Sequence, residues 1–210
     1  MLSSINGLDS KPESDIIVKK RGKLMKVKER ILQSAEDLIY QKGYDATSIS
    51  DIMEEASVGK GQLYYYFKSK KEIGLLVIQD ILADWQNELF EDIFKSNMSD
   101  VEKFSAMVDW VCKFHESQTT FYGCPIGNLI VELSTKDEDF RRPLNDFMTR
   151  WIEKLAHLLQ NLHADWSEEQ ALLQARQVIS NIQGTIVILK VSQDFQALKS
   201  SMADLKKRYC

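Results

Sequence analysis

The stretch from Thr47 to Glu72 constrains the fold of this chain more than any other. Ser48, followed three residues later by Asp51, forms a capping box that predicts the start of a helix. Apolar residues then recur at helical spacing, at Ile49, Ile52, Met53 and Ala56. Because glycine is unfavourable inside a helix, Gly59 and Gly61 predict a turn and the entry to another helix.

A second short helix is predicted from Lys60 to Phe67, and its composition is unusual. Leu63 and Phe67 can be buried, but Gln62 and three consecutive tyrosines make the rest too polar for a buried helix. Two short helices joined by a tight turn, with a polar second helix, describe a helix-turn-helix that enters the major groove of DNA. A solvated helical hairpin that binds no ligand is the alternative interpretation.

A third helix is predicted to begin after Ser69, because Ser69 and Glu72 form another capping box. Its first residues are Lys70 and Lys71, and a helix N-terminus with lysines attracts anions. Glutamine bonds base edges, while lysine and hydroxyl groups bond phosphates. We therefore expect DNA contacts in two groups: the groove residues Lys60, Gly61, Gln62, Tyr64 and Tyr65, and the phosphate-binding residues Thr47, Ser48, Lys70 and Lys71.

The segment from about Val27 to Leu76 resembles the DNA-binding domain of the TetR family of bacterial transcriptional regulators. The resemblance rests on Gly43-Tyr44, Thr47-Ser48, the run from Lys60 to Phe67, and Ser69 to Glu72. The chain departs from the family pattern at Tyr65, where histidine is common, at Gly59, where serine is frequent, and by one extra lysine before Glu72. The resemblance implies a repressor that binds a palindromic operator as a homodimer and is released by a small effector.

No strand pattern appears, so the chain is expected to be all-helical, with an N-terminal three-helix domain and a C-terminal helical bundle. Residues 1–22 are predicted to be a disordered basic tail, because they have no periodic apolar face. Residues 23–72 are predicted to be the DNA-binding domain, with the motif at about 48–67, and residues 73–210 the effector-binding and dimerisation domain. The basic run from Lys19 to Lys23 is either an arm that follows phosphates or a solvated lead-in to a helix.

The charge distribution agrees with this division. Residues 1–75 hold 13 basic against 11 acidic side chains, a net charge of +2, and the rest hold 14 against 20, a net charge of −6. A mildly basic head suffices for DNA, because only the contacting face must be positive. Three widely spaced cysteines form no disulfide or zinc pattern, and no apolar run suits a signal peptide or a membrane span. We expect a cytoplasmic protein without a metal or another cofactor.

Two other classes of protein compete with a regulator. An all-helical enzyme would need a recognisable catalytic pattern, but the three histidines lack the spacings of di-metal or zinc sites, and no phosphate loop or nucleophile elbow is present. We therefore expect no enzymatic activity. An architectural DNA-binding protein without an effector is the other alternative, and it would show little sequence preference.

Several long helices are predicted in the remainder. One runs from Ile73 to about Ile93 and would connect the DNA-binding domain to the body, and two more cover about residues 139–162 and 168–189. In the resembled family the corresponding pair forms a four-helix dimer interface, so we expect a homodimer through these two long C-terminal helices. Filling the core of a single chain is the alternative use of their apolar faces. Gly184, inside the second, predicts close approach of another helix.

Large side chains between these helices predict either an effector pocket or an ordinary core. The expected lining is Met107, Trp110, Phe114, Phe121, Cys124, Phe147 and Trp151. An apolar or aromatic effector would favour a spacing of the recognition helices that does not match DNA.

Cys124 lies in a Gly-Cys-Pro sequence before a predicted helix. Members of the resembled family that respond to reactive electrophiles carry a similar Gly-Cys and a late lysine, and Lys190 occupies a comparable place here. Such a lysine would lower the pKa of the thiol and make Cys124 a sensor. The alternative is that Cys124 is a small buried residue while Lys190 extends to solvent.

Overall fold

The computed structural model describes residues 26–210, so the predictions for the tail at residues 1–22 and for the basic run from Lys19 to Lys23 lie outside the described residues. Within residues 26–210 there are helices and no strands, which confirms the all-helical prediction. The elements are α1 (Val27–Lys42), α2 (Ile49–Glu55), α3 (Lys60–Tyr66), α4 (Lys70–Trp85), the π-helix η1 (Gln86–Phe94), α5 (Asp100–Glu116), α6 (Pro125–Leu133), α7 (Glu138–Leu162), α8 (Glu168–Ser192) and α9 (Phe195–Tyr209).

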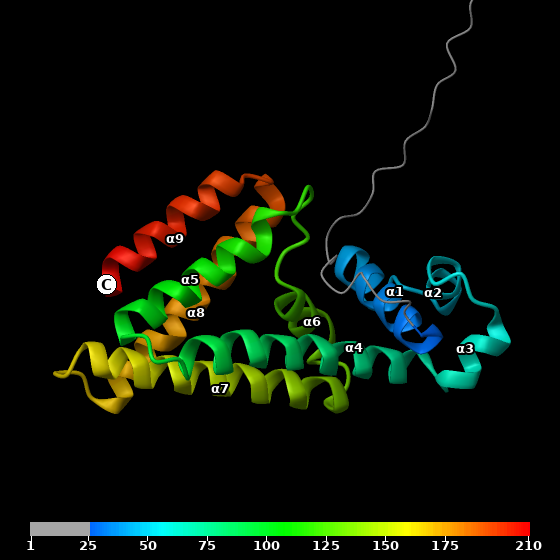
Figure 1. Cartoon of the computed structure of the whole chain (residues 1–210), viewed down its shortest axis with the longest axis horizontal. Helices are drawn as coiled ribbons and strands as arrows, with labels where there is room; N and C mark the ends of the chain where they lie inside the picture. Colours follow the sequence, from blue (N-terminus) through cyan, green and yellow to red (C-terminus); the bar gives the residue numbers. More distant parts are fainter. Residues whose placement is uncertain (1–25) are drawn as a thin grey trace, which may run out of the picture.

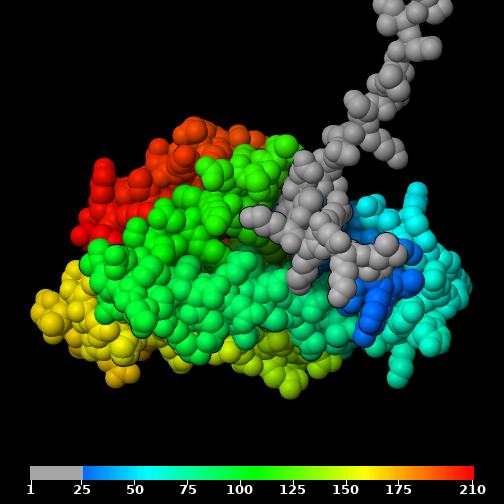
Figure 2. Space-filling model, viewed as in Figure 1, coloured from blue at the N-terminus to red at the C-terminus, as the bar shows by residue number. Residues whose placement is uncertain are grey.

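The helices are arranged in two parts that α4 connects. Figure 1 shows α1, α2 and α3 at one end of the molecule and α5, α7, α8 and α9 in the body, with α4 running from one to the other. Helix α6 lies between the two parts, and the C-terminus lies at the end far from α3. In Figure 2 the α2–α3 segment, in cyan, forms one tip of the surface. The predicted helix-turn-helix therefore lies where a partner as large as DNA can reach it.

Helices α1 to α3 enclose a small core of their own. Ile31 and Ala35 of α1, Ile52 of α2 and Leu63 of α3 are each at most 1% exposed. The Arg30 Nε donates to the Ala56 carbonyl at 2.8 Å and thereby caps the end of α2. These contacts join α1, α2 and α3 through one shared core.

The predicted helix starts are confirmed. The Ser48 Oγ accepts from the Asp51 N–H at 3.1 Å, and the Asp51 carboxylate accepts from the Ser48 N–H at 2.7 Å. The Ser69 Oγ accepts from the Glu72 N–H at 3.1 Å. The turn itself uses a different residue from the expected glycines: Ser57 has the positive φ of 51°, whereas Gly59 is extended and is the N-cap of α3.

The helix predicted from Ile73 to Ile93 changes its winding partway. It is α-helical to Trp85 and π-helical from Gln86 to Phe94, and the Lys95 N–H donates to the Phe90 carbonyl five residues earlier, at 3.1 Å. The π-helix still buries Leu89 and Ile93, as the apolar spacing predicts. Apolar residues spaced four apart, as Leu89 and Ile93 are, cannot distinguish the two windings, because positions i and i+4 lie on nearly the same side in both.

In the body, α7 packs along α8, and α5 packs against α9. Helix α7 buries its large apolar side chains within the chain, among them Phe147, Trp151 and Leu155. No helix within residues 26–210 combines the length and apolar character needed to cross a bilayer.

Candidate nucleic-acid interface and internal cavity

Helix α3 separates its side chains cleanly between core and solvent. Leu63 is buried in the helical core, whereas Tyr64 is 45% and Tyr65 81% exposed. Lys60, Gly61 and Gln62 are also exposed, and a Cβ on Gly61 would meet no atom within 4 Å. All five groove residues predicted from the sequence therefore lie on the free side of α3, where a base edge or phosphate could reach them.

Two of the predicted phosphate-binding residues lie at exposed helix starts. Ser48 is the exposed N-cap of α2. Lys70 is in the first turn of α4, where its Nζ donates to the Asp45 carbonyl at 3.2 Å and lies 4.4 Å from the centroid of the Tyr44 ring. An ammonium group has three donors, so Lys70 retains donors for an anion.

The structure does not support phosphate contacts from the other two. Thr47 is fully buried, and its Oγ1 donates to the Gly43 carbonyl at 2.7 Å, so it stabilises the turn instead. The Lys71 Nζ lies 2.7 Å from a carboxylate oxygen of both Asp137 and Asp139. The hydrogen bonds that Lys71 donates to these two carboxylates raise its pKa, and the carboxylates balance its charge within the chain.

An internal cavity lies where α4, α5, α7 and α8 meet the start of α6. Four of the predicted lining residues are present, and six others were not predicted. Four of these six come from α4 and α8, which only tertiary packing brings to this site, whereas Val111 and His115 lie on α5 beside the predicted Trp110 and Phe114. The lining consists of Trp85, Trp110, Val111, Phe114, His115, Cys124, Trp151, Ile182, Gln183 and Ile186. Its free volume is about 10 Å³, close to the minimum for one water molecule. Any larger ligand would have to displace these side chains.

Three residues predicted to line a pocket lie outside this lining. Met107 and Phe147 are fully buried core residues. Phe147 stacks on Phe90 with 5.2 Å between ring centroids. Phe121 stacks on Phe195 at the start of α9, with 5.9 Å between centroids. Their aromatic character reflects packing between helices, as the core interpretation of the sequence allowed.

Two polar atoms of the lining residues have no hydrogen-bond partner among the described residues: Trp151 Nε1 and His115 Nε2. Both side chains are only 1% exposed. Burial lowers the pKa of His115 against the opposing effect of the Val111 and Gly123 backbone. The Nδ1 of this neutral ring lies 2.9 Å from the Val111 carbonyl, to which it donates, so Nε2 is left as an acceptor. An unpaired donor and an unpaired acceptor therefore belong to two residues that line one aromatic cavity.

Cys124 is the N-cap of α6 and is 4% exposed. Burial raises the pKa of its thiol, and hydrogen bonds to Sγ from the Gly127 N–H (3.3 Å) and Gln183 Nε2 (3.5 Å) oppose that effect. The expected lowering by Lys190 is not found, because the Lys190 Nζ donates to Asn128 Oδ1 at 3.4 Å. In this conformation Cys124 matches the alternative interpretation, a small buried side chain.

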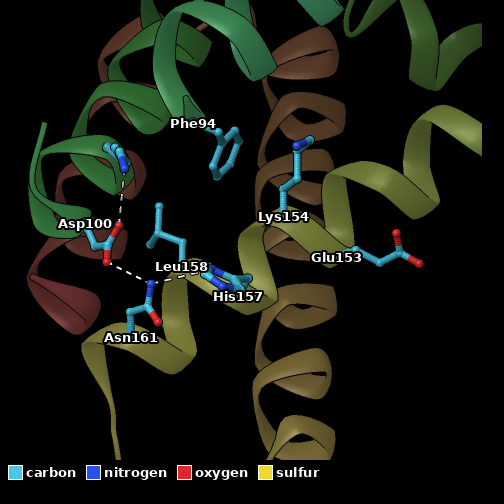
Figure 3. Close-up of a pocket in the computed structure, with 8 residues that line it drawn as sticks. Phe94, Asp100, Glu153, Lys154, His157, Leu158 and Asn161 are labelled. Carbon is cyan, nitrogen blue, oxygen red and sulfur yellow. Dashed lines mark hydrogen bonds and ion pairs between the residues drawn. The ribbon is translucent and has the colours of Figure 1, made fainter. Parts of the chain in front are cut away.

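A larger hollow of about 380 Å³ lies at the surface between α7 and the start of α5. In Figure 3 the Asn161 side chain lies between Asp100 and His157, with Phe94 and Lys154 above them. The Asn161 Nδ2 donates to Asp100 Oδ2 at 3.0 Å. Because this hollow is open and its charges are mixed, it suits an apolar effector less well than the aromatic cavity.

Comparisons with known proteins agree with this geometry. Residues 31–75 match the family model of bacterial regulatory proteins of the tetR family, and residues 100–203 match the C-terminal domain of LmrA/YxaF-like transcriptional regulators. The first match covers α2 and α3 completely, and the second covers most of the body.

Individual relatives extend over nearly the whole chain. An uncharacterised HTH-type transcriptional regulator of Lactococcus lactis is 42% identical over 186 residues, which cover 89% of this chain and 94% of the relative. The HTH-type transcriptional repressor NemR of Escherichia coli is 24% identical over 182 residues, covering 85% of this chain and 92% of NemR. The crystal structure of reduced E. coli NemR has the same fold, with a TM-score of 0.71 over 87% of this chain and 96% of that one. Taken with the helix-turn-helix geometry, these matches show that the chain belongs to the TetR family of transcriptional regulators.

Proposed function

We propose that this regulator is a repressor, that it binds a palindromic operator as a homodimer, and that an uncharged aromatic effector releases it. The main support for operator binding comes from helix α3. Its residues Gln62, Tyr64 and Tyr65 are exposed, while its other side is buried in the helical core. Side chains that a fold leaves exposed on a recognition helix are free to contact bases.

In the proposed complex, α3 lies in the major groove. Gln62 reads a base edge, Lys60 reaches a guanine or a phosphate, and the two tyrosines bond the backbone or the groove wall. Ser48 and Lys70, at the starts of α2 and α4, fix the register on phosphates. The proposed DNA-binding domain, residues 23–72, thus ends in the first turn of α4.

Helix α8 supports the homodimer. Gly184, Val187, Ile188 and Val191 follow one another at the spacing of a single helical face. The three apolar side chains are 63%, 62% and 84% exposed, and no atom lies within 4 Å of a Cβ built on Gly184. The predicted close approach at Gly184 is therefore absent within the described chain and is available to a second copy. Since α7 buries its apolar face inside the chain, the proposed interface uses α8 rather than both long helices.

The aromatic cavity supports the effector proposal. Its described lining contains no carboxylate, so a cationic ligand would lack a counter-charge. Trp151 Nε1 offers a donor and His115 Nε2 an acceptor, and each costs free energy while buried and unpaired. A flat, uncharged aromatic molecule with a hydroxyl group could pair with both. Because the cavity is nearly filled, binding of such a molecule would displace the side chains that line it.

The first test is binding to a DNA fragment that spans the region upstream of the regulator's own gene. We expect specific, salt-sensitive binding, and we expect Gln62→Ala to lower the preference for this fragment over random DNA. Binding without sequence preference would favour the architectural alternative, and a complete absence of DNA binding would overturn the proposal.

The effector is tested on the same complex. Naphthol should release the DNA, and naphthoate, its charged counterpart, should not. Trp151→Phe keeps an aromatic side chain, although a smaller one, and removes the donor, so this variant should need a higher naphthol concentration. N-ethylmaleimide, a thiol-reactive electrophile, tests the sensor hypothesis. If it releases DNA from the parent chain but not from Cys124→Ser, Cys124 is the sensor. If both proteins keep their DNA, Cys124 is a core residue.

A further inference from the structure

The turn between α1 and α2 is held by a side chain from the body. Glu132, near the end of α6, places Oε2 2.9 Å from the Tyr44 backbone nitrogen and Oε1 2.7 Å from the Asp45 backbone nitrogen. Both oxygens of one carboxylate therefore accept hydrogen bonds from consecutive N–H groups. Charge-assisted hydrogen bonds of this kind are stronger than neutral ones, and two together fix an orientation.

Gly43 makes room for this contact. Its φ is 91°, which side chains rarely adopt, and a Cβ built on it would lie 3.0 Å from Glu132 Oε2. A larger residue would therefore both strain the backbone and push the carboxylate away. The turn is shaped so that Glu132 can approach the backbone closely.

Neighbouring contacts join the same two parts of the molecule. Lys136 pairs with Asp45, Lys71 pairs with Asp137 and Asp139, and the Tyr44 ring packs edge-on against Phe140 with 5.2 Å between centroids. The ion pairs are exposed, and exposed ion pairs contribute little. Glu132 differs from them because it bonds two backbone N–H groups of the turn, so only one of the two partners is a flexible side chain.

The position of this turn determines the position of the recognition helix. Ser48, at the end of the turn, caps α2, and α1, α2 and α3 share one core. We infer that Glu132 is a positioning residue for operator recognition: it fixes the orientation of α1 to α3 on the body, and hence the separation of the two recognition helices in the dimer. This inference rests on the proposed function, because the separation matters only for a dimer that reads two half-sites.

The contact itself is tested without DNA. In the full chain, hydrogen exchange of the Tyr44 and Asp45 amides should be at least about tenfold faster in Glu132→Ala than in the parent chain, since each amide loses a hydrogen bond to a charged group. Glu132→Gln, which keeps the shape and one good acceptor, should fall between. Val131→Ala is the matched control, because Val131 is the preceding residue of α6 and is 85% exposed. Thermal unfolding of each variant confirms that it is folded.

The positioning role is tested with operators whose half-sites are moved one base pair closer or farther apart. The parent chain should discriminate strongly against both, because each shift also rotates one half-site about the DNA axis. Glu132→Ala should bind the natural operator about tenfold more weakly and discriminate less among the three spacings. Its salt slope should be unchanged, because Glu132 contacts no phosphate. Electrostatics alone predicts that Glu132→Ala would bind DNA more tightly, since the variant removes an acidic group, so weaker binding cannot be a charge effect.

Each outcome decides a different point. Unchanged exchange of both amides would overturn the contact. Faster exchange with full discrimination among the spacings would show that Glu132 serves only the local structure of the turn. Loss of all DNA binding by the parent chain would overturn the proposed function together with the positioning role, while the exchange measurement would still report on the contact.

Discussion

The two lysines at the start of α4 show how neighbouring residues of one type acquire different roles. Lys70 donates one hydrogen bond to the Asp45 carbonyl, while Lys71 is enclosed by Asp137 and Asp139. A capping box followed by two lysines predicts an anion site for both residues equally. The partners that distinguish them lie at the N-cap and first turn of α7 and are close only in the folded chain.

This difference gives a matched pair of variants. Lys70→Ala should weaken binding to all DNA sequences alike and flatten the salt slope by about one unit. Lys71→Ala should leave the slope unchanged, because its charge is already paired within the chain. The measurement is the DNA dissociation constant over a range of salt concentrations. A reduced slope for Lys71→Ala would show that the ion pairs with α7 open when DNA binds.

Gly61 is a residue whose role the isolated chain does not reveal. It lies inside α3, and alanine at this position would meet no atom within 4 Å. Gly61→Ala should therefore stabilise the chain by about 0.5–1 kcal/mol, since glycine is the poorer helix former. If the backbone of α3 approaches DNA closely, the same variant should lose operator affinity. Thermal unfolding and DNA binding measured together test this, and unchanged affinity would exclude a close approach at Gly61.

At the scale of elements, the helix-turn-helix was predictable almost to the residue because local rules define it. The capping residues, the break before Lys60 and the buried spacing all act within a few positions along the chain. By contrast, the π-helical winding of η1 and the contribution of Trp85 and Gln183 to the cavity depend on packing between distant segments, which a single sequence does not encode locally.

Helix α2 offers a test of its cap through pH. Hydrogen bonds from the Lys42 ammonium and from Ser48 lower the pKa of Asp51 from 3.8 to about 2. A lowered pKa in the folded state gives stability that is fully present above the unfolded value and is lost as the pH falls through the folded value. The difference in stability between the parent chain and Asp51→Asn should thus be constant at neutral pH and fall steadily from about pH 4 down to about pH 2. Chemical unfolding at a series of pH values measures it; a difference that is undiminished at pH 2 would contradict this role.

Helix α6 connects the two sites of the molecule. Its first end is capped by Cys124 in the wall of the aromatic cavity, and its last turn carries Glu132 on the α1–α2 turn. Nine residues of α-helix span only about 13 Å, so α6 is short and has no joint between the two contacts. A ligand that displaced the first end would therefore shift the turn as well.

At the scale of the whole molecule, the separation of the recognition helices depends on which surface joins two copies. The exposed face of α8 predicts a direct test, because Val187→Asp would place two like charges against each other across a two-fold axis. Light scattering should then give the mass of one 24.2 kDa chain instead of two. Operator affinity should fall by about a hundredfold, since each half-site would be bound independently. Val101→Asp is the control, because Val101 is an exposed valine (42%) on a different helix, α5. If Val187→Asp remained a dimer and kept its affinity, the two copies would meet through another surface. The separation of the recognition helices would then depend on that surface together with the orientation of α1 to α3 that Glu132 fixes.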